Sequence, residues 1–220
     1  MSRRTLLFPW LSAALLAASL LATDPVHASA PSPATLVARL AQPVPSQTPF
    51  VEVRQSAMLK QPLQVSGTYS RPDAATLVRQ VQQPYQETST IADGQVRVQR
   101  AGRAERVFAL GRAPELASLQ DSFAALLAGD LATLEKAFSL HSQGSAGQWQ
   151  LTLTPRSPAV AARLRQLVLH GSGNELRCIQ TQPVQGQAQR TLVGGTARAA
   201  LEHGVDDGQA LQALCQGAAS

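Results

Sequence analysis

The sequence predicts an α+β protein built on one antiparallel sheet. Apolar and polar residues alternate in several short runs, which is typical of strands with one buried face. Asp93-Gly94 separates two of these runs, and an Asp-Gly pair supplies the positive φ angles of a type I′ hairpin turn. Ala113–Phe138 lies between two groups of these runs, and its leucines are spaced as in a helix. We therefore expect a sheet that is interrupted by a helical insert.

The start of the chain has the layout of a secretory signal, which we assign to residues 1–28. The basic pair Arg3-Arg4 precedes an apolar run, Leu6–Ala22, and a polar tail. Val26 and Ala28 occupy the −3 and −1 positions of a small-residue cleavage site, so we expect cleavage after Ala28. A retained membrane anchor is the alternative, because the run is just long enough to cross a bilayer. Residues 29–220 are then expected to form one exported domain.

The domain begins with a short helix and a group of strands. Pro31–Ala41 predicts a helix in which Ser32 is the N-cap and Pro33 takes the first helical position. Strands are expected next, at Val51–Val53, at Leu63–Tyr69, on both sides of the Asp93-Gly94 turn and at Val107–Leu110.

The second half combines a helical pair with further strands and a closing helix. Within Ala113–Phe138, Gly129 fits the end of one helix and Asp130 fits the N-cap of the next. The closing helix is expected at Asp206–Gln216. Later strands are expected at Trp149–Leu153, Leu164–His170, Leu176–Thr181 and Ala188–Val193.

The chain contains two cysteines, Cys178 and Cys215. An even number of cysteines in an exported protein favours a disulfide, and two thiols alone cannot complete a zinc site. We therefore expect a Cys178–Cys215 bond that joins the closing helix to a late strand. Two buried free thiols are the alternative.

Composition and motifs point away from several functional classes. The net charge of +5 comes from basic residues scattered along the chain without a Lys/Arg run, so nucleic-acid binding is not expected. His141, His170 and His203 are far apart in sequence and indicate no metal site. Gly171-Ser172-Gly173 lacks the G-x-S-x-G pattern of a nucleophile elbow and fits a turn between strands. No nucleotide-binding loop is present. We expect no catalytic residues and no cofactor.

Several short motifs resemble the LolA family of periplasmic lipoprotein carriers. Arg71-Pro72 ends one strand run, Pro84 separates the next two, and the Asp93-Gly94 turn follows at a spacing similar to that of the family. Trp149–Pro155 is similar to the family's aromatic-x-L-x-P strand. The family usually carries aromatic residues where this chain has Ala74–Val78, so the chain looks like a divergent branch.

The resemblance implies a fold and a function. Members of that family form an open, incomplete antiparallel β-barrel with a helical lid over the concave face, and they shield acyl chains between two membranes. By this resemblance the chain is expected to be a monomeric periplasmic carrier of acyl chains or lipid-like cargo, with an inner-membrane donor and an outer-membrane acceptor. A non-enzymatic accessory or assembly protein with a filled core, acting by protein contact, is the alternative.

Alternation and the resemblance together predict the binding residues. The expected lining consists of Val51, Val53, Leu63, Val65, Tyr69, Leu116, Leu119, Phe123, Trp149, Leu151 and Leu153. Arg71 follows Tyr69 by two positions and is expected on the same apolar side, where an unpaired guanidinium is costly. In the family that the chain resembles, the matching arginine bonds carbonyls of the lid helices. Arg71 is therefore expected to latch the closed, unloaded form; a solvated arginine at a strand end is the alternative.

Overall fold

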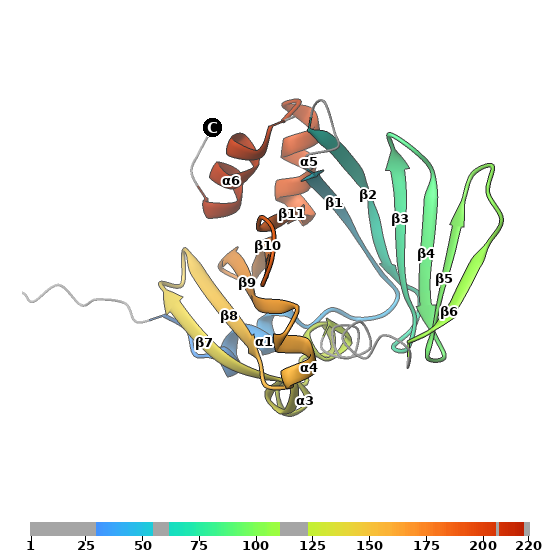
Figure 1. Ribbon diagram of the computed structural model, residues 1–220. Helices are drawn as coiled ribbons and strands as arrows, with labels where there is room; N and C mark the ends of the chain where they lie inside the picture. The colour runs from blue at the N-terminus through green and yellow to red at the C-terminus, as the bar shows by residue number, and fades with distance from the viewer. Residues whose placement is uncertain (1–29, 55–61, 111–122, 206, 218–220) are drawn as a thin grey trace, which may run out of the picture.

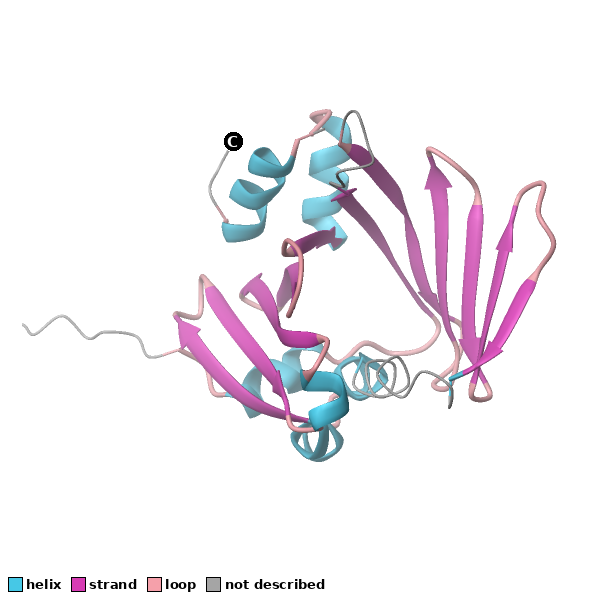
Figure 2. Ribbon diagram, viewed as in Figure 1, coloured by secondary structure: helices cyan, strands magenta, loops and turns pink. Residues whose placement is uncertain are grey.

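The computed structural model describes residues 30–54, 62–110, 123–205 and 207–217, and these form an eleven-stranded antiparallel sheet with helices on both faces (Figures 1 and 2). The strands follow the order β6-β5-β4-β3-β2-β1-β11-β10-β9-β8-β7. β6 and β7 are therefore the two edges of a sheet that does not close into a barrel. The predicted α+β class and open antiparallel barrel are confirmed.

The elements have the following bounds. The strands are β1 (Ser46–Arg54), β2 (Leu63–Arg71), β3 (Leu77–Gln83), β4 (Glu87–Ala92), β5 (Gln95–Arg100), β6 (Arg106–Ala109), β7 (Phe138–Gly144), β8 (Trp149–Pro155), β9 (Leu164–Ser172), β10 (Glu175–Pro183) and β11 (Gln189–Val193). The helices are α1 (Pro33–Leu40), α3 (Leu131–Ala137), α4 (Pro158–Ala161), α5 (Gly194–Glu202) and α6 (Gly208–Gln216). Residues 123–128 are also helical.

Local sequence signals set the ends of several elements as expected. The Ser32 side chain accepts a hydrogen bond from the Thr35 amide at 3.2 Å, which caps α1. Asp130 caps α3 in the same way, through the Thr133 amide at 3.0 Å. The hairpin between β4 and β5 has Asp93 at φ 51° and Gly94 at φ 68°, the left-handed pair that a type I′ turn requires.

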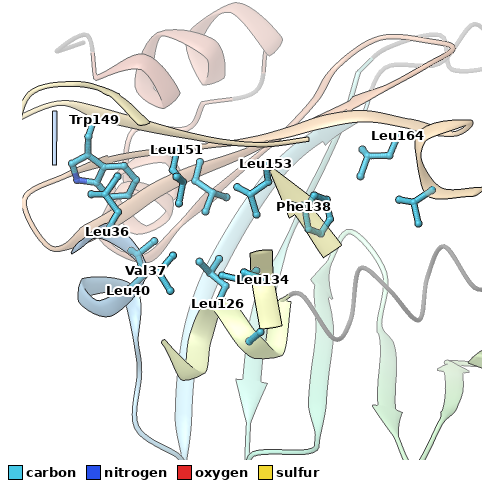
Figure 3. Packing of buried hydrophobic residues seen from close by; sticks show 13 residues of the cluster. Leu36, Val37, Leu40, Leu126, Leu134, Phe138, Trp149, Leu151, Leu153 and Leu164 are labelled. Atoms are coloured by element: carbon cyan, nitrogen blue, oxygen red, sulfur yellow. The ribbon is translucent and has the colours of Figure 1, made fainter. Parts of the chain in front are cut away.

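One face of the sheet, which we call the inner face, carries α1, residues 123–128 and α3. Figure 3 shows these helices beneath β8, with Leu36, Val37, Leu126 and Leu134 pointing towards Leu151 and its strand neighbours. These side chains form the largest apolar core among the described residues, and most are less than 6% exposed. The β7–β9 end of the sheet is therefore filled on its inner face.

The opposite face, which we call the outer face, carries α5 and α6. Both helices pack on β1, β10 and β11, around a smaller core that includes Val51, Leu192 and Leu211. The expected disulfide between Cys178 of β10 and Cys215 of α6 is present in this core. It ties the last helix to the middle of the sheet.

Three elements were not predicted from the sequence, one of them the short helix α4. β7 follows α3 without a break at Phe138, where the sequence analysis placed the end of a helix. α5 begins directly at the end of β11, where Gly194-Gly195 has the composition of a turn. Gly194 has φ 61°, and this left-handed step redirects the chain from strand to helix.

The predicted facing of β1 was wrong. Val51 and Val53 lie on the outer face and pack with the core beneath α5 and α6. Phe50 and Glu52 take the inner face instead, opposite Gly67 and Val65 of β2. The middle of β1 is covered on both faces, so apolar residues occupy both sides, and alternation alone does not show which set faces inward.

The expected signal segment, residues 1–28, lies outside the described residues. Within the described ranges, no helix is both long enough and apolar enough to cross a membrane.

Candidate functional site

A cavity of about 510 Å³ lies on the inner face, beside the filled core. Its walls come from the end of α1, the 123–128 helix, the first half of β1, the end of β2 and the strands β10 and β11. Ligand pockets in proteins commonly have volumes of about 300–1,000 Å³. The cavity is therefore large enough for a small ligand or part of an acyl chain.

Apolar side chains form the inner wall of this cavity. Tyr69 lies between Phe50 and Phe123, with ring centroids 4.7 and 6.3 Å away. Ile179 and Val193 continue the wall along β10 and β11. Burial of Tyr69 raises the pKa of its phenol, so the side chain stays neutral over a wide pH range. The wall thus offers uncharged, mostly aliphatic and aromatic surface.

Arg71 closes one side of the cavity at the end of β2. It is only 5% exposed, and its Nη1 donates hydrogen bonds to the carbonyl oxygens of Leu127 at 3.2 Å and of Gln42 at 3.4 Å. Leu127 belongs to the 123–128 helix, and Gln42 lies just after α1. A buried guanidinium needs such acceptors, and its planar set of five donors suits carbonyls that converge from two segments. The contacts join the sheet to both helical segments.

A charged cluster, Glu52, Arg54 and Arg79, lies farther along the inner face. Glu52 is 2% exposed and forms ion pairs of 2.6 Å with both arginines. Gln189 donates a further hydrogen bond to Glu52 at 2.9 Å. The guanidinium of Arg79 also stacks over the Phe50 ring, 4.6 Å from its centroid. The buried carboxylate is therefore well compensated.

The sequence analysis missed this cluster. Glu52 and Arg54 alternate with valines, a pattern that predicted a solvated face. Their partners Arg79 and Gln189 come from β3 and β11, far away in the sequence. No short motif could have indicated that these four side chains meet.

The predicted lining residues fall into five groups, of which Val51 and Val53, on the outer face, are described above. Tyr69 and Phe123 line the cavity. Leu63 and Val65 share the inner face with Phe50 but lie beyond the cavity wall. Leu116 and Leu119 lie outside the described residues. The three predicted residues of β8 also face inward, but they are buried in the filled core beneath α1 and are not cavity residues: Trp149, Leu151 and Leu153.

Other cavity residues were not predicted as lining. Leu176, Ile179 and Val193 contribute apolar wall, and Leu77 lies at its β3 side. The same alternation that was applied to β2 could have selected Ile179 and Val193, because both lie on predicted strands. Alternation could not show that β1 and β11 are neighbours, because these strands are distant in sequence and adjacent only in the sheet.

The described residues contain no group of three or more His, Cys, Asp or Glu side chains placed to hold a metal ion.

His170 lies on the outer face beside Cys178, with which it forms a strand pair. Burial lowers the pKa of His170, although a hydrogen bond with Gln180 acts in the opposite direction.

Comparison with known proteins adds a family. A family described as "Outer membrane lipoprotein carrier protein LolA-like" matches residues 27–218. Among solved structures, the chain is similar to a LolA superfamily protein from Nitrosomonas europaea, with 12% sequence identity and a TM-score of 0.37. That similarity covers 71% of this chain and 72% of the other. No curated protein sequence matches the chain.

Proposed function

Because the chain belongs to the family of LolA-like outer membrane lipoprotein carrier proteins, we propose that it carries acyl chains or lipid-like cargo through the periplasm. It binds the cargo in the inner-face cavity as a monomer, without catalysis, and passes it from an inner-membrane donor towards an outer-membrane acceptor. The segment 1–28 acts as a signal for export and is removed after Ala28.

The cavity is the observation that carries this proposal. Its wall of Tyr69, Phe123, Ile179 and Val193 offers apolar surface next to a core that is already filled. Burying one methylene group contributes about 0.8 kcal/mol, so exposing a chain of about sixteen carbons to water costs about 13 kcal/mol relative to burying it. Such a load can cross an aqueous compartment only inside an apolar cavity, and this one has space for part of the chain.

Release of the load requires a state that binds it less tightly. Arg71 supports such a state, because its hydrogen bonds to Leu127 and Gln42 hold two helical segments against the sheet. In our proposal these bonds favour the closed, unloaded form and thereby help to expel cargo. Without a preference of this kind, a carrier with a large apolar wall would retain what it binds.

Two neighbouring residues of β3 provide a matched test. Leu77 lines the cavity, whereas Val78 pairs with Ser70 of β2 and Thr90 of β4 and lies on the other face of the sheet. Both side chains are half-buried. Leu77→Glu places a carboxylate in the cavity wall and should lower the affinity for the methyl ester of dansylundecanoic acid, a neutral fluorescent probe, at least about tenfold.

Val78→Glu introduces the same charge on the same strand and should leave probe binding within about twofold of the unaltered protein. Circular dichroism shows whether both variants fold. Equal binding by folded Leu77→Glu and Val78→Glu would contradict a cargo site in this cavity. Mass spectrometry of lipid extracted from the purified protein provides an independent check. Absence of both lipid and probe binding would favour an accessory protein that acts by contact.

A further inference from the structure

The lining of the cavity has an apolar part and a polar part. Tyr69, Phe123 and Ile179 belong to the apolar part. The polar part, which we call the mouth, includes Ser46–Pro49, the turn between β9 and β10 and the start of α5. Arg39, Arg198 and Glu175 line the same cavity. A ligand that fills the cavity would therefore meet both apolar surface and polar or charged groups.

The mouth arises from unequal strand lengths. β1 pairs with β2 from Ser46 to Arg54, but with β11 only from Phe50 to Glu52. The chain turns away from the sheet into α5 after Val193, so Ser46–Pro49 has no β11 residue beside it. That side of β1 lines the cavity. A strand edge of this kind presents backbone hydrogen-bonding groups, which suit a polar part of a ligand.

Positive charge exceeds negative charge among the side chains that line the cavity. Arg39, in the last turn of α1, and Arg198, in α5, are exposed, and neither forms a hydrogen bond or ion pair with another described residue. Arg71 is engaged by carbonyl oxygens. Glu175 already accepts a hydrogen bond from the Gly195 amide at 3.1 Å. Two guanidinium groups of the lining are therefore available to a ligand.

We propose that the cargo is an amphiphile with an anionic head group, such as a carboxylate or a phosphate. The head lies at the mouth and is bound by Arg39 and Arg198, while the acyl tail extends towards Tyr69. Guanidinium groups suit this task because their planar donors match the oxygens of carboxylates and phosphates. The inference rests on the proposed carrier function and specifies, in addition, that the cargo is anionic.

Dansylundecanoic acid and its methyl ester provide a test, because they share one tail and differ in the charge of the head. At a pH where the free carboxyl group is ionised, the unaltered protein should bind the acid more tightly than the ester. Replacing the two exposed arginines of the cavity, Arg39→Gln with Arg198→Gln, should reduce this preference about tenfold, since exposed charge pairs contribute modestly. The affinity for the ester should change less than the affinity for the acid.

A matched control removes two arginines that lie away from the cavity. Arg97 of β5 and Arg103 of the following turn are exposed and do not line it. Arg97→Gln with Arg103→Gln changes the net charge equally and should leave the preference unchanged. Glu175→Gln keeps an acceptor oxygen for Gly195 and removes a negative charge at the mouth, so it should increase the preference for the acid. Inorganic phosphate alone should displace little probe, because it lacks the tail.

The outcomes separate this inference from the proposed function. Binding of acid and ester with equal affinity, or an unchanged preference in the Arg39/Arg198 variant, overturns the anionic cargo and leaves the carrier function standing. An equal loss of preference in the Arg97/Arg103 control also overturns it, because net charge would then explain the effect. Binding of neither probe overturns both proposals.

Discussion

The guanidinium group of Arg71 donates a hydrogen bond to the carbonyl oxygen of Leu127 over 3.2 Å, which joins the end of β2 to the helix above the cavity. The same nitrogen reaches Gln42, just after α1. Three segments that are far apart in the sequence therefore meet at one buried side chain. Any movement that widens this part of the cavity has to break these bonds or carry Arg71 along.

Arg71→Leu should slow the release of cargo without preventing its uptake. Hydrogen bonds to charged groups are worth about 1.5–3 kcal/mol each, so their loss weakens the closed form relative to the loaded one. We expect transfer of the dansyl ester from protein to lipid vesicles, followed by stopped-flow fluorescence, to slow at least about tenfold. Arg97→Leu, at an exposed position, is the control. Normal loading combined with an unchanged transfer rate would argue against the latch.

Much of the fold follows from local sequence patterns. The Ser32 cap, the Asp93-Gly94 hairpin and the strands around Leu63–Tyr69 and Trp149–Leu153 each depend on residues that are close in sequence, and each is confirmed. The LolA-like family membership is confirmed as well. These features could be predicted because turn chemistry and side-chain alternation act over a few residues.

The remaining features depend on contacts between distant segments. Phe50 and Val51 are both fully buried, because helices cover one face of β1 and the aromatic cluster covers the other. The alternation in β1 therefore does not show which of its side chains face the inner side of the sheet. Glu52 meets Arg79 and Gln189 only after β3 and β11 take their places in the sheet. The unpredicted helix α5 begins at two glycines, which normally indicate a turn.

Gly171→Ala should destabilise the fold, because Trp149 lies directly over Gly171. A Cβ atom at this position would come within 2.0 Å of Cζ2 in the indole ring. The ring is also held in place by a hydrogen bond, since its Nε1 donates to the Gly173 carbonyl at 3.0 Å. Overpacking of this kind typically costs about 1–3 kcal/mol. We expect a lower urea midpoint and an altered tryptophan fluorescence spectrum.

Gly147→Ala is the matched control for this prediction. A Cβ atom there would meet no heavy atom closer than 4.0 Å, and the backbone is not in the left-handed region. Its urea midpoint should stay close to that of the unaltered protein. Equal midpoints for Gly171→Ala and Gly147→Ala would show that the indole ring does not occupy this position.

Removing the disulfide should destabilise the protein by about 3–4 kcal/mol. The bond joins Cys178 and Cys215, which are 37 positions apart, and the chain-entropy model predicts roughly this value for a loop of that length. Cys178→Ser with Cys215→Ser should lower the urea midpoint of oxidised protein. Added reductant should shift the unaltered protein towards the same midpoint and leave the double variant unchanged. Two free thiols per chain in denaturant without reductant would contradict the bond.

The last prediction concerns His170, on the outer face of β9. Its side chain is 8% exposed, and among the described residues its Nε2 has no hydrogen-bond partner. Burial lowers its pKa, and the positive charge of Arg190 acts in the same direction. The neutral imidazole is therefore favoured by the folded state, whereas the unfolded chain takes up a proton at a higher pH.

As the pH falls below about 6.5, the ordinary pKa of histidine, the unfolded chain gains a proton that folded His170 resists, so the free energy of unfolding should decrease. Urea unfolding at several pH values measures this slope. His170→Leu should flatten the part of the slope that begins near this pH, because no group at that position then titrates. His141→Gln, which changes an exposed histidine of β7, should leave the slope unchanged. If His170→Leu kept the full slope of the unaltered protein, other groups would be responsible for it and a buried neutral His170 would be ruled out.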